Sequence, residues 1–378
     1  MMSHIFARLS RNKFRRHFVF THMVEIAFSC FLVLITLHQI YGSNTIYIEW
    51  NHDKVYKELG ELVVNTNKGW ISYSELEENV FRPMKYEILK PTVPIPTLRR
   101  IEPASCAQIF GDWLRFIETA KYKGPQYSMP EELENMYTLN GYIRKSRYYR
   151  DDAHSSSSER VWDQIDEWRN LTEEEFIAVS NYGKTSMAVY HSLKAFPLVD
   201  QYGAVFGSLT PWAESMALQA GAREVLTIEY LKLKIEGKSN VHYKHPLDFA
   251  RNFESYLDTF DFVISFSSLE HSGLGRYGDS LDPNGDLREL QKIHCALKPG
   301  GLLFLGLPRG QDILNYNVHR IYGRIRLAMI MEGYELLATF RENYKHPRSL
   351  SLHDFDAQQS ASGGEQDLYV LRKRRTKL

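Results

Sequence analysis

Residues 202–211 read YGAVFGSLTP, and the order of residue types in this segment indicates the kind of fold. A short apolar run ends on Gly207 and is followed by a polar turn and by Pro211, which suits the first turn of a helix. Thr210 is the residue expected to cap that helix, and Gly221 is expected to end it. A strand, a tight turn and a helix N-terminus leave free backbone N–H groups pointing at one spot, where a polar ligand can bind.

Short apolar runs alternate with helical stretches downstream of this segment. This alternation is typical of a parallel sheet wrapped by helices. The sequence therefore predicts an α/β, Rossmann-like fold: a mostly parallel central sheet with helices on both faces. The expected strands are residues 203–207, 224–229, 241–243, 260–266 and 302–308, with a closing strand pair at 334–340 and 368–372; helices are expected at 286–297 and 319–331.

Upstream, the polar run at residues 151–158 is expected to be an exposed loop. It divides a stem and accessory region, residues 42–157, from a Rossmann-like domain at 158–378. In the accessory region, residues 111–123 are expected to form an amphipathic helix. After the loop, Thr172 and Glu175 have the spacing of a capping box, which begins a helix expected to run to about residue 194.

The N-terminus has the pattern of a membrane anchor. Residues 1–17 contain five Lys and Arg and no acid, and the mostly apolar run 18–41 is about as long as a bilayer-spanning helix. We expect an uncleaved signal anchor with a cytosolic basic tail, which makes the chain a single-pass protein of the endoplasmic reticulum or Golgi with its catalytic domain in the lumen. The sequon at Asn170 is consistent with that side. A cleaved signal peptide and a mitochondrial presequence are the alternatives.

Composition excludes some classes of function. The formal net charge is +0, so the chain lacks the basic excess typical of nucleic-acid binding, and no nucleic-acid partner is expected. Of the three cysteines, Cys30 lies in the apolar run, so only Cys106 and Cys295 are free to pair in a lumen. Their spacing is not that of a zinc site, and no metal is predicted. The oligomeric state does not follow from the sequence.

Polar side chains at successive strand ends predict a cofactor site. Gly207, Ser208 and Thr210 offer the turn and the helix N-terminus. Glu229 ends the next strand, about 20 residues on, where a carboxylate can accept both ribose hydroxyls. Asp248 follows the third strand and is expected to bind an adenine amine, and Ser267 follows the fourth. Because the carboxyl ends of parallel strands share one edge of a sheet, these side chains are expected to meet there.

Further motifs carry a resemblance to a known family. Residues 260–265 (FDFVIS), 268–271 (SLEH) and 297–302 (LKPGGL) look like motifs of class I S-adenosylmethionine-dependent methyltransferases. The longer runs 268–286 and 317–322 resemble domain-of-unknown-function family 268, which is methyltransferase-like. The resemblance covers about residues 161–373 and implies S-adenosylmethionine as cofactor, but it implies no substrate.

The first strand departs from the methyltransferase pattern. Class I methyltransferases usually carry a denser glycine motif after this strand, with an acid before it. Here the strand itself contains no acid, and Asp200 is the nearest candidate. The departure bears on cofactor binding more than on the fold.

His271 and its neighbours are the candidates for catalysis and for acceptor binding. A neutral imidazole suits removal of a proton from a hydroxyl, so His271 is predicted to be the base, and Glu270 to orient it or to bind the substrate. Asp279, His319 and Arg320 are predicted to contact the substrate. Alternatively, His319 and Arg320 only begin a helix, and Glu270 and His271 only shape the pocket.

Three functions remain open at this point. The first is a methyltransferase that acts on a glycan or on a small hydroxylated acceptor. The second is a non-catalytic domain that binds a partner, which the sparse glycine motif favours. The third is a type II membrane glycosyltransferase, because Asp354 and Asp356 have the spacing of an acid-x-acid metal motif. A dehydrogenase is disfavoured because no G-x-G-x-x-G follows a strand.

Overall fold

The computed structural model describes residues 62–153, 159–356 and 365–375. The basic tail at 1–17 and the apolar run at 18–41 lie outside the described residues, so the signal anchor stays a prediction. Within the described ranges, no helix combines the length and the apolar character that crossing a membrane requires.

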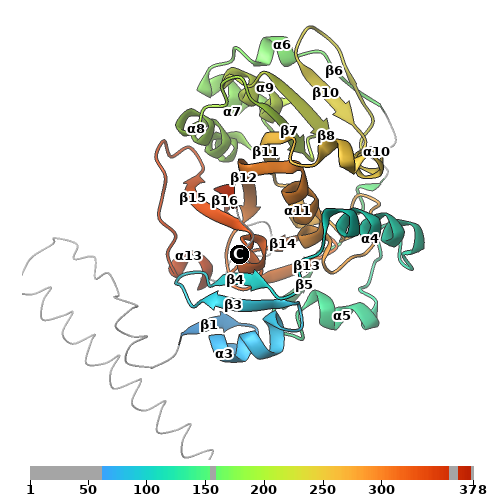
Figure 1. Ribbon diagram of the computed structural model, residues 1–378, viewed down its shortest axis with the longest axis vertical. Helices are drawn as coiled ribbons and strands as arrows, with labels where there is room; N and C mark the ends of the chain where they lie inside the picture. Colours follow the sequence, from blue (N-terminus) through green and yellow to red (C-terminus); the bar gives the residue numbers. More distant parts are fainter. Residues whose placement is uncertain (1–61, 154–158, 357–364, 376–378) are drawn as a thin grey trace, which may run out of the picture. The chain divides into compact units, whose positions relative to one another are not determined.

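A seven-stranded sheet forms the centre of the described part, with the strand order β10-β8-β7-β11-β12-β16-β15 (Figure 1). The first five strands in this order, β10 to β12, are parallel to one another, whereas β16 runs antiparallel to both β12 and β15. The predicted α/β fold with a mostly parallel sheet and a closing strand pair is therefore confirmed. The strands span β7 Tyr202–Phe206, β8 Glu224–Ile228, β10 Val241–Lys244, β11 Phe260–Phe266, β12 Leu297–Pro308, β15 Tyr334–Arg341 and β16 Gln366–Lys373.

Helices cover both faces of this sheet, which explains why the middle strands read as almost continuous apolar runs. In β11 every residue except Asp261 is buried. One face is covered by α7 Glu173–Val179, α8 Met187–Ala195 and α9 Trp212–Gln219, and the other by α10 Pro246–Arg251, α11 Gly285–Ala296 and α4 Cys106–Thr119 (Figure 1). Strand order changes direction between β7 and β11, which is where ligands bind in open α/β sheets.

The accessory region packs into the same core as the sheet. Phe110 of α4 stacks on Phe253 and meets Phe249 edge to face. Cys106, at the start of α4, forms a disulfide with Cys295 of α11, the pair that the sequence left free. In addition, β5 Arg144–Arg147 pairs with β13 Ile313–Tyr316, so the accessory region adds a strand to a second, three-stranded sheet.

Smaller elements complete the described part. They are β1 Val63–Thr66, β2 Gly69–Ser72, α3 Tyr73–Leu76, the π-helix Glu77–Phe81, β3 Tyr86–Lys90, β4 Thr97–Arg100, α5 Glu131–Tyr137, β6 Arg160–Trp162, α6 Ile165–Trp168, β9 Leu233–Ile235, β14 His319–Ile321, α12 Arg326–Ile330 and α13 His353–Asp356, with 3₁₀ turns at Gly183–Ser186, Phe253–Tyr256 and Leu269–His271.

Two of the predicted helices are wrong in extent. Residues 319–331 do not form one helix, because His319–Ile321 is strand β14, hydrogen-bonded to β13 across a turn at Asn317, and the helix α12 is limited to Arg326–Ile330. The capping box of Thr172 and Glu175 is confirmed at the start of α7. That helix stops at Val179, because Ser180 is extended and Gly183 has a φ of 53°.

The prediction that Thr210 caps the helix after β7, which is α9, is also wrong. Pro211 occupies the N-cap position of α9, which begins at Trp212, and the hydroxyl of Thr210 is buried without a hydrogen-bond partner. Gly221 ends the helix with a φ of 97°, as predicted.

The disulfide should contribute strongly to stability because it closes a loop of 189 residues, which restricts the unfolded chain. Replacing Cys106 and Cys295 together by Ser should lower the free energy of unfolding by about 2–5 kcal/mol. Chemical denaturation monitored by fluorescence measures this loss. Cys30→Ser is the matched control, since Cys30 is outside the bond, and equal stability of the two variants would contradict the prediction.

Candidate active site

A cavity of about 420 Å³ lies at the carboxyl ends of β7, β8 and β11. Its volume falls in the range of pockets that bind small molecules. It brings together seven of the predicted site residues, namely Gly207, Ser208, Thr210, Glu229, Ser267, His271 and Asp279. The predicted residues Asp248, Glu270, His319 and Arg320 lie outside its wall.

Gly207 makes the turn after β7 approach the turn after β11. Its φ is 77°, and a Cβ at this position would overlap the side chain of Ser268. The N–H of Gly207 donates to the carbonyl of Ile228, 3.0 Å away, which fixes the turn against β8. The glycine is thus required by both the backbone conformation and the close approach.

Glu229 lies at the end of β8 and is held in place by the backbone. Its carboxylate accepts a hydrogen bond from the N–H of Leu231 at 3.0 Å, and only 9% of the residue is exposed. Burial raises the pKa of Glu229, and the bonds from backbone N–H groups oppose that rise. The carboxylate therefore has a fixed position on the cavity wall.

Glu214, a buried acid that contacts the turn after β7, was not among the residues predicted from the sequence. Glu214 of α9 is fully buried, and it accepts hydrogen bonds from the hydroxyls of Ser208 at 3.0 Å and Thr227 at 2.9 Å. Burial raises its pKa to about 7. The sequence feature that could have revealed Glu214 is that it is the one acid in the otherwise uncharged run 212–218 (WAESMAL). Asp200, the acid considered earlier, lies before β7, at the opposite end from the cavity, with its side chain 79% exposed.

His271 presents an unprotonated nitrogen. Its Nδ1 lies 2.6 Å from the carbonyl oxygen of Val318, and a carbonyl can only accept, so Nδ1 carries the hydrogen. Burial and the nearby Arg276 lower the pKa of His271 to about 3, so the ring is neutral at physiological pH. The lone pair is then on Nε2, in the form that a general base needs.

Glu270 lies behind His271 rather than in the cavity. Its residue is 1% exposed, and one carboxyl oxygen accepts a hydrogen bond from Ser267 Oγ at 2.8 Å. The same oxygen is 3.8 Å from Nε2 of His271, which is too long for a hydrogen bond. Burial raises the pKa of Glu270 to about 7. Its contacts are those of a residue that shapes the turn.

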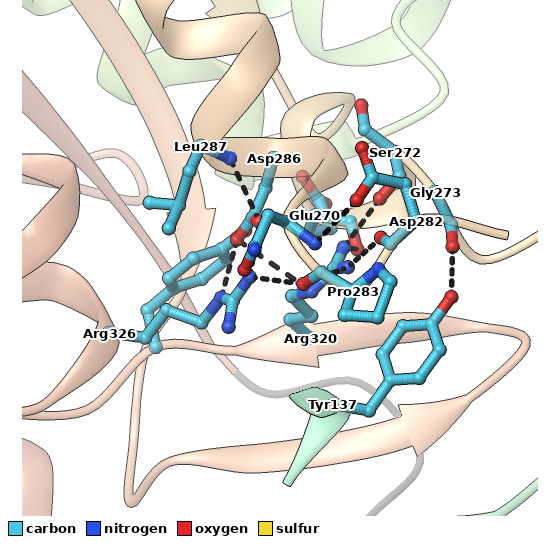
Figure 2. Close-up of polar contacts among 12 residues, drawn as sticks. Tyr137, Glu270, Ser272, Gly273, Asp282, Pro283, Asp286, Leu287, Arg320 and Arg326 are labelled. Atoms are coloured by element: carbon cyan, nitrogen blue, oxygen red, sulfur yellow. Dashed lines mark hydrogen bonds and ion pairs between the residues drawn. The ribbon is translucent and has the colours of Figure 1, made fainter. Parts of the chain in front are cut away.

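Arg320, predicted to bind substrate, holds the cavity loop from behind. Figure 2 shows its guanidinium group surrounded by backbone carbonyls of that loop. It donates to the carbonyl oxygen of Ser272 at 2.7 Å and to those of Asp282 and Pro283 at 3.3 Å. Arg320 is 2% exposed, so it positions the loop that carries His271 and cannot reach a ligand from there.

Asp286 lies beside Arg320 and belongs to the same buried network. Its carboxylate accepts hydrogen bonds from Nε of Arg326 at 2.7 Å and from Nη2 of Arg326 at 2.5 Å (Figure 2). It also accepts from the hydroxyl of Tyr322 at 3.0 Å. Burial alone would raise the pKa of Asp286, but Arg320 and Arg326 hold it at about 2. The position of Asp286 before a predicted helix also suggests a helix cap, but Asn284 occupies the N-cap of α11.

The remaining predicted residues have different surroundings. Asp279 accepts hydrogen bonds from the N–H groups of Gly273 at 2.7 Å and Gly275 at 3.2 Å, and its other oxygen is buried without a partner. His319 Nε2 lies 3.0 Å from the amide of Asn315. The side chain of Asp248 is 59% exposed and faces Arg251 at 3.7 Å.

The accessory region and the residues before β7 supply cavity residues that the sequence analysis missed. Trp113, Phe116 and Ile117 project from α4, and Tyr182 comes from the segment that breaks the helix before α8. Glu289 and Lys292 of α11 line the same end as α4. None of these residues belongs to a strand-end motif, so they could be found only by knowing how α4 packs.

The acid-x-acid motif is engaged in ion pairs. Asp354 binds Arg341 at 2.9 Å and Arg309 at 3.2 Å, and it also accepts from Ser351. Among the described residues, no group of three His, Cys, Asp or Glu side chains is placed to hold a metal ion. The structure therefore gives no support to the glycosyltransferase hypothesis.

The buried Glu214 generates a pH-dependent prediction. Because its pKa is raised in the folded protein, the folded state binds the extra proton between the ordinary carboxyl pKa and about 7, and stability falls as the pH rises through this range. Glu214→Gln should therefore raise the free energy of unfolding at pH 8 by roughly 1–3 kcal/mol relative to the parent protein, with little gain at pH 4.5. Thermal melts at both values measure this. The exposed Glu118→Gln is the control for loss of a charge, and a gain that is independent of pH would refute the prediction.

No curated protein matches the sequence. The matching solved structures include a candidate hemolysin of Lactococcus lactis (13% identity, 53% of this chain and 90% of that chain, TM-score 0.34). They also include the 1,6-didemethyltoxoflavin-N1-methyltransferase of Burkholderia thailandensis with bound S-adenosylhomocysteine (15% identity, 56% of this chain and 84% of that chain, TM-score 0.34). A third is the N-methyltransferase NodS of Bradyrhizobium japonicum with S-adenosylhomocysteine (10% identity, 56% of this chain and 96% of that chain, TM-score 0.32).

These similarities are too weak to assign a cofactor or a substrate. The match to a family model is specific: residues 200–374 match the family described as Caenorhabditis protein of unknown function, DUF268. This match agrees with the resemblance to domain-of-unknown-function family 268 that the motifs predicted.

Proposed function

We propose that this protein is an S-adenosylmethionine-dependent methyltransferase whose acceptor is a glycan or a small hydroxylated molecule. The observation that carries the proposal is that the Gly207 turn, the Glu229 carboxylate and the neutral His271 line one cavity. The position of this cavity at the carboxyl ends of β7, β8 and β11 is the place where open α/β sheets bind nucleotide-like ligands.

The cavity wall fits the proposed cofactor. Glu229 is positioned to accept hydrogen bonds from ribose hydroxyls. Thr210 has a buried hydroxyl without a partner, and such groups are rarely left unsatisfied, which supports a polar ligand beside it. Tyr182, Trp212 and Phe266 line the cavity and contact one another edge to face, and aromatic faces attract a sulfonium cation.

His271 is the residue proposed to act on the acceptor. When bound, S-adenosylmethionine supplies an electrophilic methyl group, and the acceptor hydroxyl must lose its proton. Nε2 of His271 can take that proton because Nδ1 is already committed to the carbonyl of Val318. The low pKa keeps the ring neutral and available, and it makes the base weak, so positioning must supply a large part of the rate.

The secretory location is part of the same proposal. A disulfide is stable in an oxidising compartment and rare in the cytosol, so the Cys106–Cys295 bond supports lumenal placement. Asn170 of the sequon is exposed, as a glycosylation acceptor must be. The apolar run 18–41 would then be the anchor in the membrane.

Two variants should distinguish ligand binding from catalysis: Gly207→Ala is expected to lose binding, and His271→Asn is expected to lose methyl transfer alone. Calorimetry of the full-length protein with S-adenosylhomocysteine should show binding, which Gly207→Ala should abolish because the added Cβ overlaps Ser268. His271→Asn keeps an N–H for the Val318 carbonyl but removes the base. It should bind like the parent, while methyl transfer to a hydroxylated acceptor falls about 10²–10⁴-fold.

Arg251→Gln is the control for both measurements, since Arg251 is exposed and pairs only with Asp248 among the described acids. Parent protein that fails to bind S-adenosylhomocysteine would refute the proposal. Binding without transfer to any hydroxylated acceptor would instead identify a non-catalytic ligand-binding domain.

Glycosylation tests the location. The protein expressed in eukaryotic cells should lose apparent mass on treatment with an endoglycosidase, and Asn170→Gln should remove that shift. Asn140→Gln, which lies outside any sequon, is the matched control. If the parent protein has the mass of the unmodified chain and endoglycosidase treatment does not change it, this result would count against lumenal placement.

A further inference from the structure

We propose that Glu289 and Lys292, packed against Trp113, recognise the hydrogen-bonding edge of an adenine base at the α4 end of the cavity. The inference rests on the proposed function and names the residues that select its cofactor. Neither Glu289 nor Lys292 follows a strand, and Trp113 lies outside residues 200–374, so the strand-end motifs do not indicate them.

Glu289 and Lys292 form a donor and acceptor pair on one face of α11. Nζ of Lys292 lies 2.6 Å from a carboxylate oxygen of Glu289 and 3.4 Å from the centre of the Trp113 ring. The side chain of Lys292 is 3% exposed, yet both residues line the cavity. An ammonium group has three N–H donors, so its contact with one carboxylate and one ring leaves donor capacity for a ligand. The second carboxylate oxygen can accept.

Tyr230 connects this pair to the ribose site. It follows Glu229 directly and lines the same cavity. Glu229, Asp279 and Glu289 line the same cavity as Tyr230. A nucleoside with its ribose on Glu229 would extend its base past Tyr230 toward Glu289.

The walls at this end suit a flat apolar ring. Phe116 and Ile117 of α4, Phe249 of α10 and Ile293 of α11 line the cavity there. An aromatic base gains from burial between such side chains, but its polar edge must be satisfied. The disulfide between Cys106 and Cys295 fixes α4 against α11, and thereby fixes the spacing of these walls.

Adenine has the complementary edge. Its exocyclic amine donates and the adjacent ring nitrogen accepts, so a carboxylate and an ammonium side by side can bind both. Hypoxanthine reverses this pattern, because it has a carbonyl in place of the amine and an N–H in place of the acceptor. Asp248, which the strand-end pattern assigned to the amine, faces Arg251 with its side chain 59% exposed.

The experiment compares two ligands in the same protein. Full-length protein should bind S-adenosylhomocysteine at least about tenfold more tightly than S-inosylhomocysteine, since mismatched polar groups in a buried site are costly. Glu289→Gln should bring this ratio close to one, because an amide can donate to the hypoxanthine carbonyl. Lys292→Met should also reduce the ratio. The ratio is insensitive to a general loss of stability, which acts on both ligands alike.

Asp248→Asn is the matched control, and it should keep the ratio of the parent protein. A ratio that is unchanged in Glu289→Gln and Lys292→Met, or one that collapses in Asp248→Asn, would overturn the inference and leave the proposed function intact. Parent protein that binds neither ligand would overturn both.

Discussion

The turns after β7 and β11 are in contact, and the cavity depends on that contact. A glycine is required at position 207 because any side chain there would occupy the space of Ser268. With the turns this close, the chain leaves β11 through Ser267, whose φ of 52° is unusual for a residue with a side chain. His271 follows within one short helical turn and so faces the same hollow as Glu229. A single steric constraint thus places residues from three strands around one ligand volume.

Buried charge gives the cavity loop its shape. Arg320 binds carbonyl oxygens of this irregular loop, and the carboxylate of Asp286 lies against the guanidinium groups of both Arg320 and Arg326 and offsets part of their positive charge. Isolated buried ions are costly, whereas a closed network of ions and backbone dipoles is tolerated. The loop can therefore be irregular and still hold His271 and Asp279 in fixed positions, which a ligand-binding wall needs.

Much of the sheet could be predicted from sequence because its strands are buried on both faces and read as apolar runs, as in β11. Gly207, Glu229 and His271 could be placed because parallel strands end at one edge. The role of Arg320 could not be predicted, since charged residues that bind ligands and those that bind the backbone look alike in sequence. Trp113 and Lys292 were missed for another reason: they meet only because α4 packs on α11, across a long separation in the chain.

The shared core of the accessory region and the sheet domain limits how this protein can be divided. A fragment cut to the residues that match the family model, 200–374, would lose β5, one of the two partners of β13, and the half of the disulfide that comes from Cys106. It would uncover Phe249 and Phe253, where Phe110 now packs, and carry an unpaired thiol beside them. Such a polypeptide would expose apolar side chains that are now buried, so the segment that matches the family model is smaller than the unit that shares one core.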